Sequence, residues 1–232
     1  MNCCRQAGKS VTAAAAVVDE LERPSSLVLL VAPSLRQSQE LYRKARELHR
    51  EAGGCRIVAE SALRVELANG SRLVALPGSE RTTRGFSAVD LLVADEAARV
   101  EDSLYRSVRP MLAVSGGRLI ALSTPFGRRG FFFDAWRGDE QWSRVEVPAT
   151  SCPRIPPDFL AAERVALGPR WFAQEYCCSF EDTAGAVFAY DDIAEAITGD
   201  VEPLWVPGVD ARADDDDESA SLWSKGGEVE NR

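Results

Sequence analysis

The sequence is poor in histidine and lysine, and it lacks any long apolar run. Its single histidine is His49, and its six cysteines include no Cys-x-x-Cys pair, so we expect reduced thiols in a cytoplasm and no zinc site. The longest apolar runs fall far short of the roughly 20 residues that cross a bilayer. The residues after Met1 have neither the basic start nor the apolar stretch of a secretion signal. A soluble, unsecreted protein is therefore expected, and 232 residues suffice for one α/β domain with a short extra piece.

Acidic residues outnumber basic ones, and the formal net charge is −9. This charge is unevenly distributed: residues 201–232 hold nine acidic and three basic residues, and so carry −6 of the total. The preceding part of the chain is close to neutral, which leaves a nucleic-acid partner open. Only three of the 27 basic residues are lysines. Arginine suits phosphate contacts, although a GC-rich genome would produce the same bias.

Short apolar runs alternate with amphipathic segments along the chain, as they do in α/β proteins with a parallel sheet. Helices are predicted over residues 8–22 and 34–52, and a helical pair over 157–166 and 170–176 is divided at Gly168-Pro169. Strands are predicted over residues 27–32, 91–94 and 119–122. A β-hairpin is predicted to join residues 64–67 to 72–76 through Asn69-Gly70.

Gly8-Lys9-Ser10 opens a predicted helix and matches the end of the P-loop pattern G-x-x-x-x-G-K-[ST]. Backbone N–H groups at such a helix start suit a triphosphate, Lys9 would reach its β- and γ-phosphates, and the Ser10 hydroxyl would bind Mg²⁺. The match is incomplete, because Cys3 stands where the pattern has its first glycine. An ordinary loop before a helix is the alternative interpretation.

An apolar strand ends in two acids at Asp95-Glu96. Asp95 would serve Mg²⁺, and Glu96 would be the general base for attack of water on the γ-phosphate. The alternative is a pair of acids that caps a helix. Because both motifs occur in the expected order, the sequence favours a P-loop ATPase.

Two further segments carry polar side chains that suit an ATPase. Ser123-Thr124 follows a predicted strand, where its hydroxyls could sense a γ-phosphate, or it is a polar turn before Pro125. Arg84 lies in a loop before the Asp95-Glu96 strand, where it could neutralise transition-state charge. It could equally be a solvated charge or a DNA phosphate contact.

In this order the motifs resemble those of the large terminase subunits of tailed bacteriophages, whose ATPase domain drives DNA into the procapsid. The resemblance covers nearly the whole chain. It is carried by the deviant Walker A motif Cys4-Arg5-Gln6-Ala7-Gly8-Lys9-Ser10, the strand at 28–33 followed by Arg36-Gln37, Arg84-Gly85, the Walker B motif at 92–97, the coupling motif at 122–125 with Gly127 and residues 130–132, and the closing segment Phe172-Ala173-Gln174-Glu175-Tyr176 with Phe180 and Val187-Phe188.

The resemblance implies a RecA-like P-loop NTPase that uses ATP and Mg²⁺. By this resemblance the nucleotide would be bound by Arg5, Gln6, Ala7, Gly8, Lys9 and Ser10, and the metal by Ser10 and Asp95. Glu96 would be the catalytic base, and Arg84 is a weaker candidate for an arginine finger that acts on a neighbouring subunit. Ser123 and Thr124 would couple hydrolysis to movement. The implied partners are double-stranded DNA, a portal protein and a small terminase subunit. The subunits would form a homo-oligomeric ring in the host cytoplasm, with no membrane involved.

The resemblance also divides the chain into an ATPase domain over residues 1–182, a linker over 183–203 and the start of an RNase H-like nuclease domain over 204–232. Asp210 resembles the first metal ligand of that nuclease, but the following residues are too few to supply the others, so we expect no DNA cleavage. The strand that precedes the P-loop is expected to be missing, which predicts weak or absent ATP binding by a chain truncated at both ends. A helicase-like nucleic-acid remodelling ATPase and an inactive prophage remnant are the alternatives.

Overall fold

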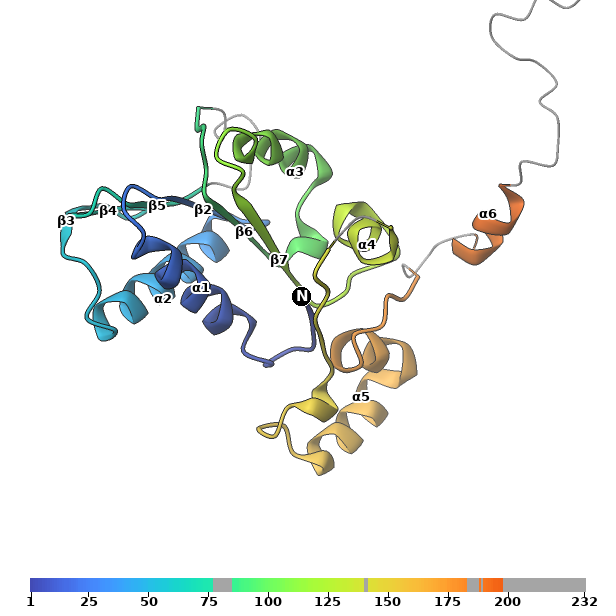
Figure 1. Cartoon of the computed structure of the whole chain (residues 1–232). Helices are drawn as coiled ribbons and strands as arrows, with labels where there is room; N and C mark the ends of the chain where they lie inside the picture. The colour runs from blue at the N-terminus through green and yellow to red at the C-terminus, as the bar shows by residue number, and fades with distance from the viewer. Residues whose placement is uncertain (77–84, 140–141, 183–187, 189, 198–232) are drawn as a thin grey trace, which may run out of the picture. The chain divides into compact units, whose positions relative to one another are not determined.

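The computed structural model describes residues 1–76, 85–139, 142–182, 188 and 190–197 (Figure 1). The chain divides into two compact units, Met1–Tyr190 and Asp191–Arg232. Helix α6, Tyr190–Ala196, spans the sequence boundary between them. Within the described ranges, no helix combines the length and the apolar character that crossing a bilayer requires.

A six-stranded sheet with the order β3-β4-β5-β2-β6-β7 forms the centre of the first unit. Four neighbouring strands are parallel, namely β5 (Arg72–Ala75), β2 (Leu27–Val31), β6 (Leu91–Asp95) and β7 (Arg118–Leu122). The antiparallel edge consists of β4 (Arg64–Leu67), which pairs with β5 in the predicted hairpin, and β3 (Ile57–Glu60). The predicted α/β fold with a mostly parallel sheet is confirmed.

The side chains of β2 alternate between two hydrophobic cores, one on each face of the sheet. Val28 and Leu30 pack in the core that includes α1 (Lys9–Leu21) and α2 (Leu35–Glu51). Leu27, Leu29 and Val31 pack in the core that includes α3 (Asp102–Val108) and α4 (Gly130–Arg137), on the other face (Figure 1). All five residues of β2 are buried. Burial on both faces explains why this strand is a continuous apolar run without polar alternation.

The predicted helices α1 and α2 are present, and their ends have local causes. Gly8, with φ of 95°, precedes α1, and Ser34 caps α2 by accepting a hydrogen bond from the Gln37 N–H at 3.4 Å. Helix α5, Pro157–Tyr176, contains the predicted break, because Gly168 is non-helical with φ of 76° and Pro169 follows it. Together these elements confirm the predicted helical segments.

Several short elements were not predicted. Helices α3 and α4 have only seven and eight residues, which is too short for a distinct helical period. Strand β3 is exposed or half-buried along its length and therefore shows no apolar alternation. The 3₁₀ turns η2 (Ala97–Arg99), η3 (Arg109–Leu112) and η4 (Ala149–Ser151) were not predicted either.

The segment before the P-loop forms the short strand β1, Asn2–Cys3, which pairs in parallel with β8, Glu146–Val147. On its other side, Cys3 N donates to Ser123 O at 2.9 Å, and the Met1 ammonium donates to Ala121 O at 2.6 Å. The expectation that this strand is missing is thus corrected in one respect, because two residues of strand are held between β7 and β8 by hydrogen bonds on both sides. They fix the position at which the P-loop begins.

Candidate nucleotide-binding site

A pocket of about 520 Å³ lies at the amino end of α1 and at the carboxyl ends of β6 and β7. Carboxyl ends of parallel strands are where α/β proteins place their ligands. The charged side chains that line the pocket are mostly basic, with the single acid Glu96 against Arg5, Lys9, Lys44, Arg99 and Arg154. The excess of positive charge suits an anionic ligand.

The P-loop turns sharply before α1. Gln6 and Gly8 both have positive φ, of 62° and 95°, and a side chain at Gly8 would meet Arg154 Nη2 at 3.1 Å. No side chain caps the helix, and the hydrogen bonds of its first turn begin with the Val11 N–H, which donates to Gly8 O at 3.0 Å. Gly8, Lys9 and Ser10, which precede this bond, line the pocket. Both Gln6 and Ser10 line the pocket, while Ala7 packs against the core formed by Cys4, Ala149, Cys152 and Cys178. The loop therefore provides the backbone donors and the dipole that a phosphate requires.

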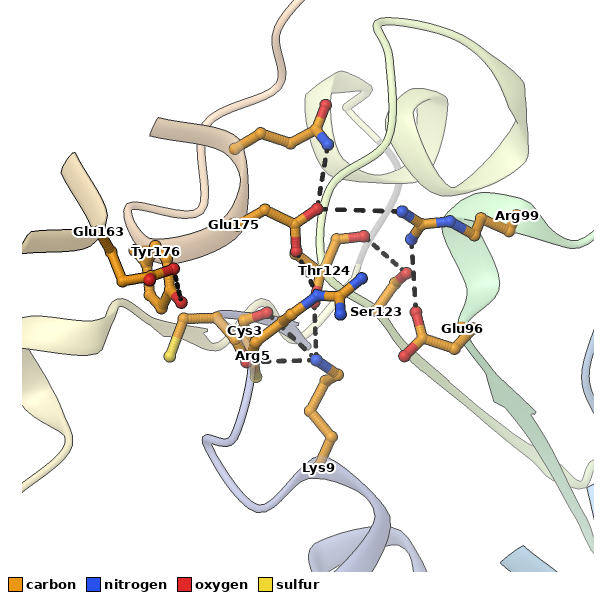
Figure 2. A network of polar contacts seen from close by, with 12 residues as sticks. Cys3, Arg5, Lys9, Glu96, Arg99, Ser123, Thr124, Glu163, Glu175 and Tyr176 are labelled. Atoms are coloured by element: carbon orange, nitrogen blue, oxygen red, sulfur yellow. Dashed lines mark hydrogen bonds and ion pairs between the residues drawn. The ribbon is translucent and has the colours of Figure 1, made fainter. Parts of the chain in front are cut away.

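The side chain of Lys9 lines the pocket and connects the P-loop to the segment after β7, as its contacts in Figure 2 show. Its Nζ donates to Thr124 Oγ1 at 2.8 Å and to the carbonyl of Cys4 at 3.2 Å. Thr124 is 2% exposed, and the neighbouring Ser123 donates from Oγ to the Thr124 carbonyl at 2.7 Å. The structure thus brings together the predicted P-loop lysine and the predicted coupling residues.

Asp95 and Glu96 follow β6 directly and have different surroundings. Asp95 is buried, and its Oδ1 accepts a hydrogen bond from the Glu96 N–H at 3.0 Å. Burial raises the pKa of the Asp95 carboxyl, and the charge of Glu96 raises it further. The hydrogen bond from the Glu96 N–H and the charges of Lys9 and Lys44 act in the opposite direction. Glu96 adopts a left-handed backbone conformation, with φ of 48°, and its side chain lines the pocket.

Two charged residues with no predicted role, Arg99 and Glu175, complete the polar network of Figure 2. Glu175, 6% exposed in the last turn of α5, accepts a hydrogen bond from Arg5 Nε at 2.5 Å. Its other carboxylate oxygen lies 4.0 Å from Arg99 Nη2, and Arg99 Nη1 lies 3.5 Å from Glu96 Oε2. The spacing of three residues between Glu96 and Arg99 is a signal that the sequence contained. No local pattern connects Arg5 with Glu175.

Buried cysteines support the start of the P-loop. Cys4 and Cys152 are buried with their sulfur atoms 3.8 Å apart, and all six cysteines are free thiols. Burial, with contributions from neighbouring groups, raises the pKa of Cys4 and of Cys178 to about 12. These thiols behave as small apolar side chains in a core that anchors the loop.

The remaining predicted site residues, Arg84 and Asp210, lie outside the residues that the structure describes.

Comparisons with known proteins point to one family. A family model described as "Terminase large subunit, T4likevirus-type, N-terminal" matches residues 1–195. The chain is 26% identical over 226 residues to the large terminase subunit of Thermus phage G20c, covering 80% of this chain and 46% of the relative. It thus spans about half the length of that relative.

Solved structures show a similar fold. The large terminase ATPase domain of Thermus phage P74-26 has a TM-score of 0.66 at 21% identity, covering 78% of this chain and 87% of that domain. The large terminase of a thermophilic bacteriophage in complex with ATP-gamma-S has a TM-score of 0.63 at 12% identity, covering 77% of this chain and 46% of the other. At identities this low, the likeness to these structures shows the fold alone.

Proposed function

Because the chain belongs to the terminase large subunit family, we propose that residues 1–182 form an ATPase domain that binds and hydrolyses ATP in the pocket at the P-loop. One observation carries the proposal. Lys9, Glu96 and Thr124 come from three separate segments, yet all line one pocket whose charged lining is otherwise basic. A triphosphate complements this charge, and the amino end of α1 supplies further donors for its oxygens.

The residues divide the chemistry between them. Lys9 and the first N–H groups of α1 would hold the phosphates, and Arg5 lies at the same rim. Glu96 would accept a proton from the attacking water. The water oxygen then bonds to the γ-phosphorus while the bond from this phosphorus to the leaving ADP oxygen breaks. Thr124, which contacts Lys9, would respond to loss of the γ-phosphate, together with Ser123.

Mg²⁺ would be held by the Ser10 hydroxyl and the Asp95 carboxylate, and when bound it neutralises charge on the phosphate oxygens. The chemistry of these residues fits this ion. Among the described residues, the Glu96 N–H is the one backbone donor to the Asp95 carboxylate, and it engages Oδ1, so the carboxylate retains acceptor capacity. No group of three or more acidic, histidine or cysteine side chains in the described part of the chain could hold a metal alone. Mg²⁺ commonly uses one or two carboxylates together with substrate phosphates and water.

We further propose that hydrolysis drives translocation of double-stranded DNA into a procapsid, in a homo-oligomeric ring in the host cytoplasm with a portal protein and a small terminase subunit as partners. Family membership supports this proposal, since relatives that match this chain are large terminase subunits. Arg84 would act on a neighbouring subunit. Residues 183–203 would be a linker and 204–232 the start of a nuclease domain, with Asp210 as a metal ligand.

The first experiment measures ATP binding and single-turnover hydrolysis by the purified 232-residue chain. Lys9→Ala should weaken nucleotide binding about 10- to 100-fold, because it removes charge-assisted hydrogen bonds. Glu96→Gln should leave binding intact and slow hydrolysis about 100-fold or more. Arg56→Gln is the control, because Arg56 is exposed at the far edge of the sheet. Wild-type chain that fails to bind ATP would refute the proposal and would agree with the sequence-based expectation of weak binding.

A helicase-like ATPase is the alternative within the same chemistry. Stimulation of hydrolysis by double-stranded DNA supports the packaging motor, whereas stimulation by single strands alone supports the helicase-like function. Absence of both binding and turnover would indicate an inactive remnant.

A further inference from the structure

Arg99 lies between two carboxylates that come from distant parts of the sequence. Its Nη1 is 3.5 Å from Glu96 Oε2, and its Nη2 is 4.0 Å from Glu175 Oε1 (Figure 2). The two nitrogens of one planar group thus face a pocket carboxylate on one side and a buried carboxylate of α5 on the other. Arg99 itself lines the pocket.

An aromatic ring holds the guanidinium in this place. Arg99 Cζ lies 4.3 Å from the centroid of the Phe126 ring, within the range of a cation–π contact. Phe126 follows Ser123-Thr124-Pro125, the segment that Lys9 contacts. Arginine can stack on a ring through its flat face while its edges donate to carboxylates, which lysine cannot do. The residue type therefore fits a bridging role.

Glu96 needs an external partner to hold its carboxylate in one orientation. Its side chain is 29% exposed, whereas Asp95 is buried. Among the residues that the structure describes, Arg99 is the one side chain with which its carboxylate makes an ion pair. A general base must be held within hydrogen-bond reach of the water from which it takes a proton.

Glu175, the second carboxylate beside Arg99, is held more firmly than Glu96. The side chain of Glu175 is only 8% exposed, and it also receives hydrogen bonds from Arg5 and Gln174. A buried carboxylate with several donors has few orientations available, so it is a fixed point against which Arg99 can be placed. Movement of the last turn of α5 would change the position of Arg99 and, through it, that of Glu96.

We propose that Arg99 is a positioning residue for Glu96, and that it makes the orientation of this base depend on Glu175 in α5 and on Phe126 after β7. The inference rests on the proposed function, because it takes Glu96 to be the general base. It adds a residue that connects the proposed base to α5 and to the segment that holds the predicted coupling residues Ser123 and Thr124.

The test compares single-turnover hydrolysis and equilibrium ATP binding for the full chain and its variants. Arg99→Gln should slow hydrolysis on the order of 10- to 100-fold, since misplacement of a catalytic group has effects of this size. ATP affinity should fall by no more than about threefold, because four of the five basic side chains that line the pocket remain. The thermal midpoint should stay close to wild type. Arg99→Lys should recover only part of the rate, because it keeps the charge without the bridge. Arg56→Gln serves as the matched arginine control.

The decisive measurement repeats Arg99→Gln in a Glu96→Gln background. If Arg99 acts through Glu96, the second substitution lowers the residual rate no further, because residues that act as a unit are not additive. An equal fold loss in both backgrounds would show that Arg99 acts on the substrate directly and would overturn the inference. So would an Arg99→Gln rate within twofold of wild type. These results leave the proposed function intact, whereas wild-type chain without ATP binding or turnover would overturn both.

Discussion

Lys9 Nζ donates a hydrogen bond of 2.8 Å to Thr124 Oγ1, so the P-loop lysine is bound to the segment that follows β7. The two residues are far apart in the sequence, and Thr124 is almost completely buried. To hold phosphate oxygens as proposed, Lys9 must exchange this partner for them, at least in part. The bond therefore connects occupation of the pocket to the end of β7.

Thr124→Val tests this connection with nearly unchanged side-chain volume. Lys9 keeps the Cys4 carbonyl as an acceptor, so ATP affinity should change by no more than about threefold, equivalent to less than 1 kcal/mol. Hydrolysis should fall about tenfold if Thr124 relays the state of the γ-phosphate. Thr124→Ser, which keeps the hydroxyl, is the control and should retain both properties. A loss of ATP affinity as large as that of Lys9→Ala would contradict the prediction.

Asp95→Asn should stabilise the nucleotide-free chain at neutral pH while it abolishes Mg²⁺-dependent binding. The pKa of Asp95 is raised above its ordinary value of 3.8 by burial, so the folded state binds a proton more tightly there than the unfolded state. This contribution to stability is fully present below pH 3.8 and is lost as pH rises through the raised pKa. The substitution removes the buried charge and keeps an acceptor for the Glu96 N–H.

Urea unfolding of wild type and Asp95→Asn across pH measures this effect. The advantage of the variant should be largest at neutral pH and should shrink toward acid pH. Asp19→Asn, on the exposed face of α1, controls for the general change in charge. A variant less stable than wild type at pH 7 would show that the Asp95 charge is compensated by groups other than those described above.

Gly8→Ala should weaken ATP binding beyond its effect on stability. A φ of 95° strains any residue with a side chain by roughly 1 to 3 kcal/mol, and the new Cβ would meet Arg154 Nη2 at 3.1 Å. Relief of the backbone strain or of the contact with Arg154 would move the loop that would hold the phosphates. Gly53→Ala, with φ of 68° and open space around it, should cost similar stability and leave ATP affinity unchanged. Equal affinities for both variants would indicate that the conformation at Gly8 does not shape the pocket.

Leu30→Ala should destabilise the fold by about 2 to 5 kcal/mol, because it leaves a cavity beneath α1 and α2 in the centre of the sheet. Denaturant unfolding monitored by circular dichroism measures this loss. Val58→Ala on the edge strand β3 is the control, since Val58 is half-exposed and should change stability by less than about 0.5 kcal/mol. A small effect of Leu30→Ala would mean that the core closes around the cavity.

The parts of the fold that could be predicted from sequence are those in which burial follows from neighbouring residues. The run Leu27-Val28-Leu29-Leu30-Val31 is apolar because both faces of β2 are covered, and Asn69-Gly70 marks the hairpin directly. Strand β3 has no such pattern, because it lies exposed at the edge. The break of α5 at Gly168 was visible, since glycine and proline act on the local backbone.

Some residues of the candidate site could also be predicted from the sequence, whereas contacts between distant residues could not. Lys9, Ser10, Asp95 and Glu96 could be found in the sequence, because phosphate and metal chemistry requires those residue types directly after a turn or a strand. The bond between Arg5 and Glu175 joins residues 170 positions apart and has no local signature.

The sequence by itself determined the family, the α/β layering and the candidate residues of the proposed nucleotide site, because each rests on short-range pattern or on motif chemistry. Only the tertiary structure decided that Lys9 contacts Thr124, that Asn2–Cys3 forms a strand between β7 and β8, and that Arg99 lies between Glu96 and Glu175. These contacts join the ends of separate strands and of α5. Their partners are chosen by how the sheet and its helices pack, which no local pattern of residues encodes.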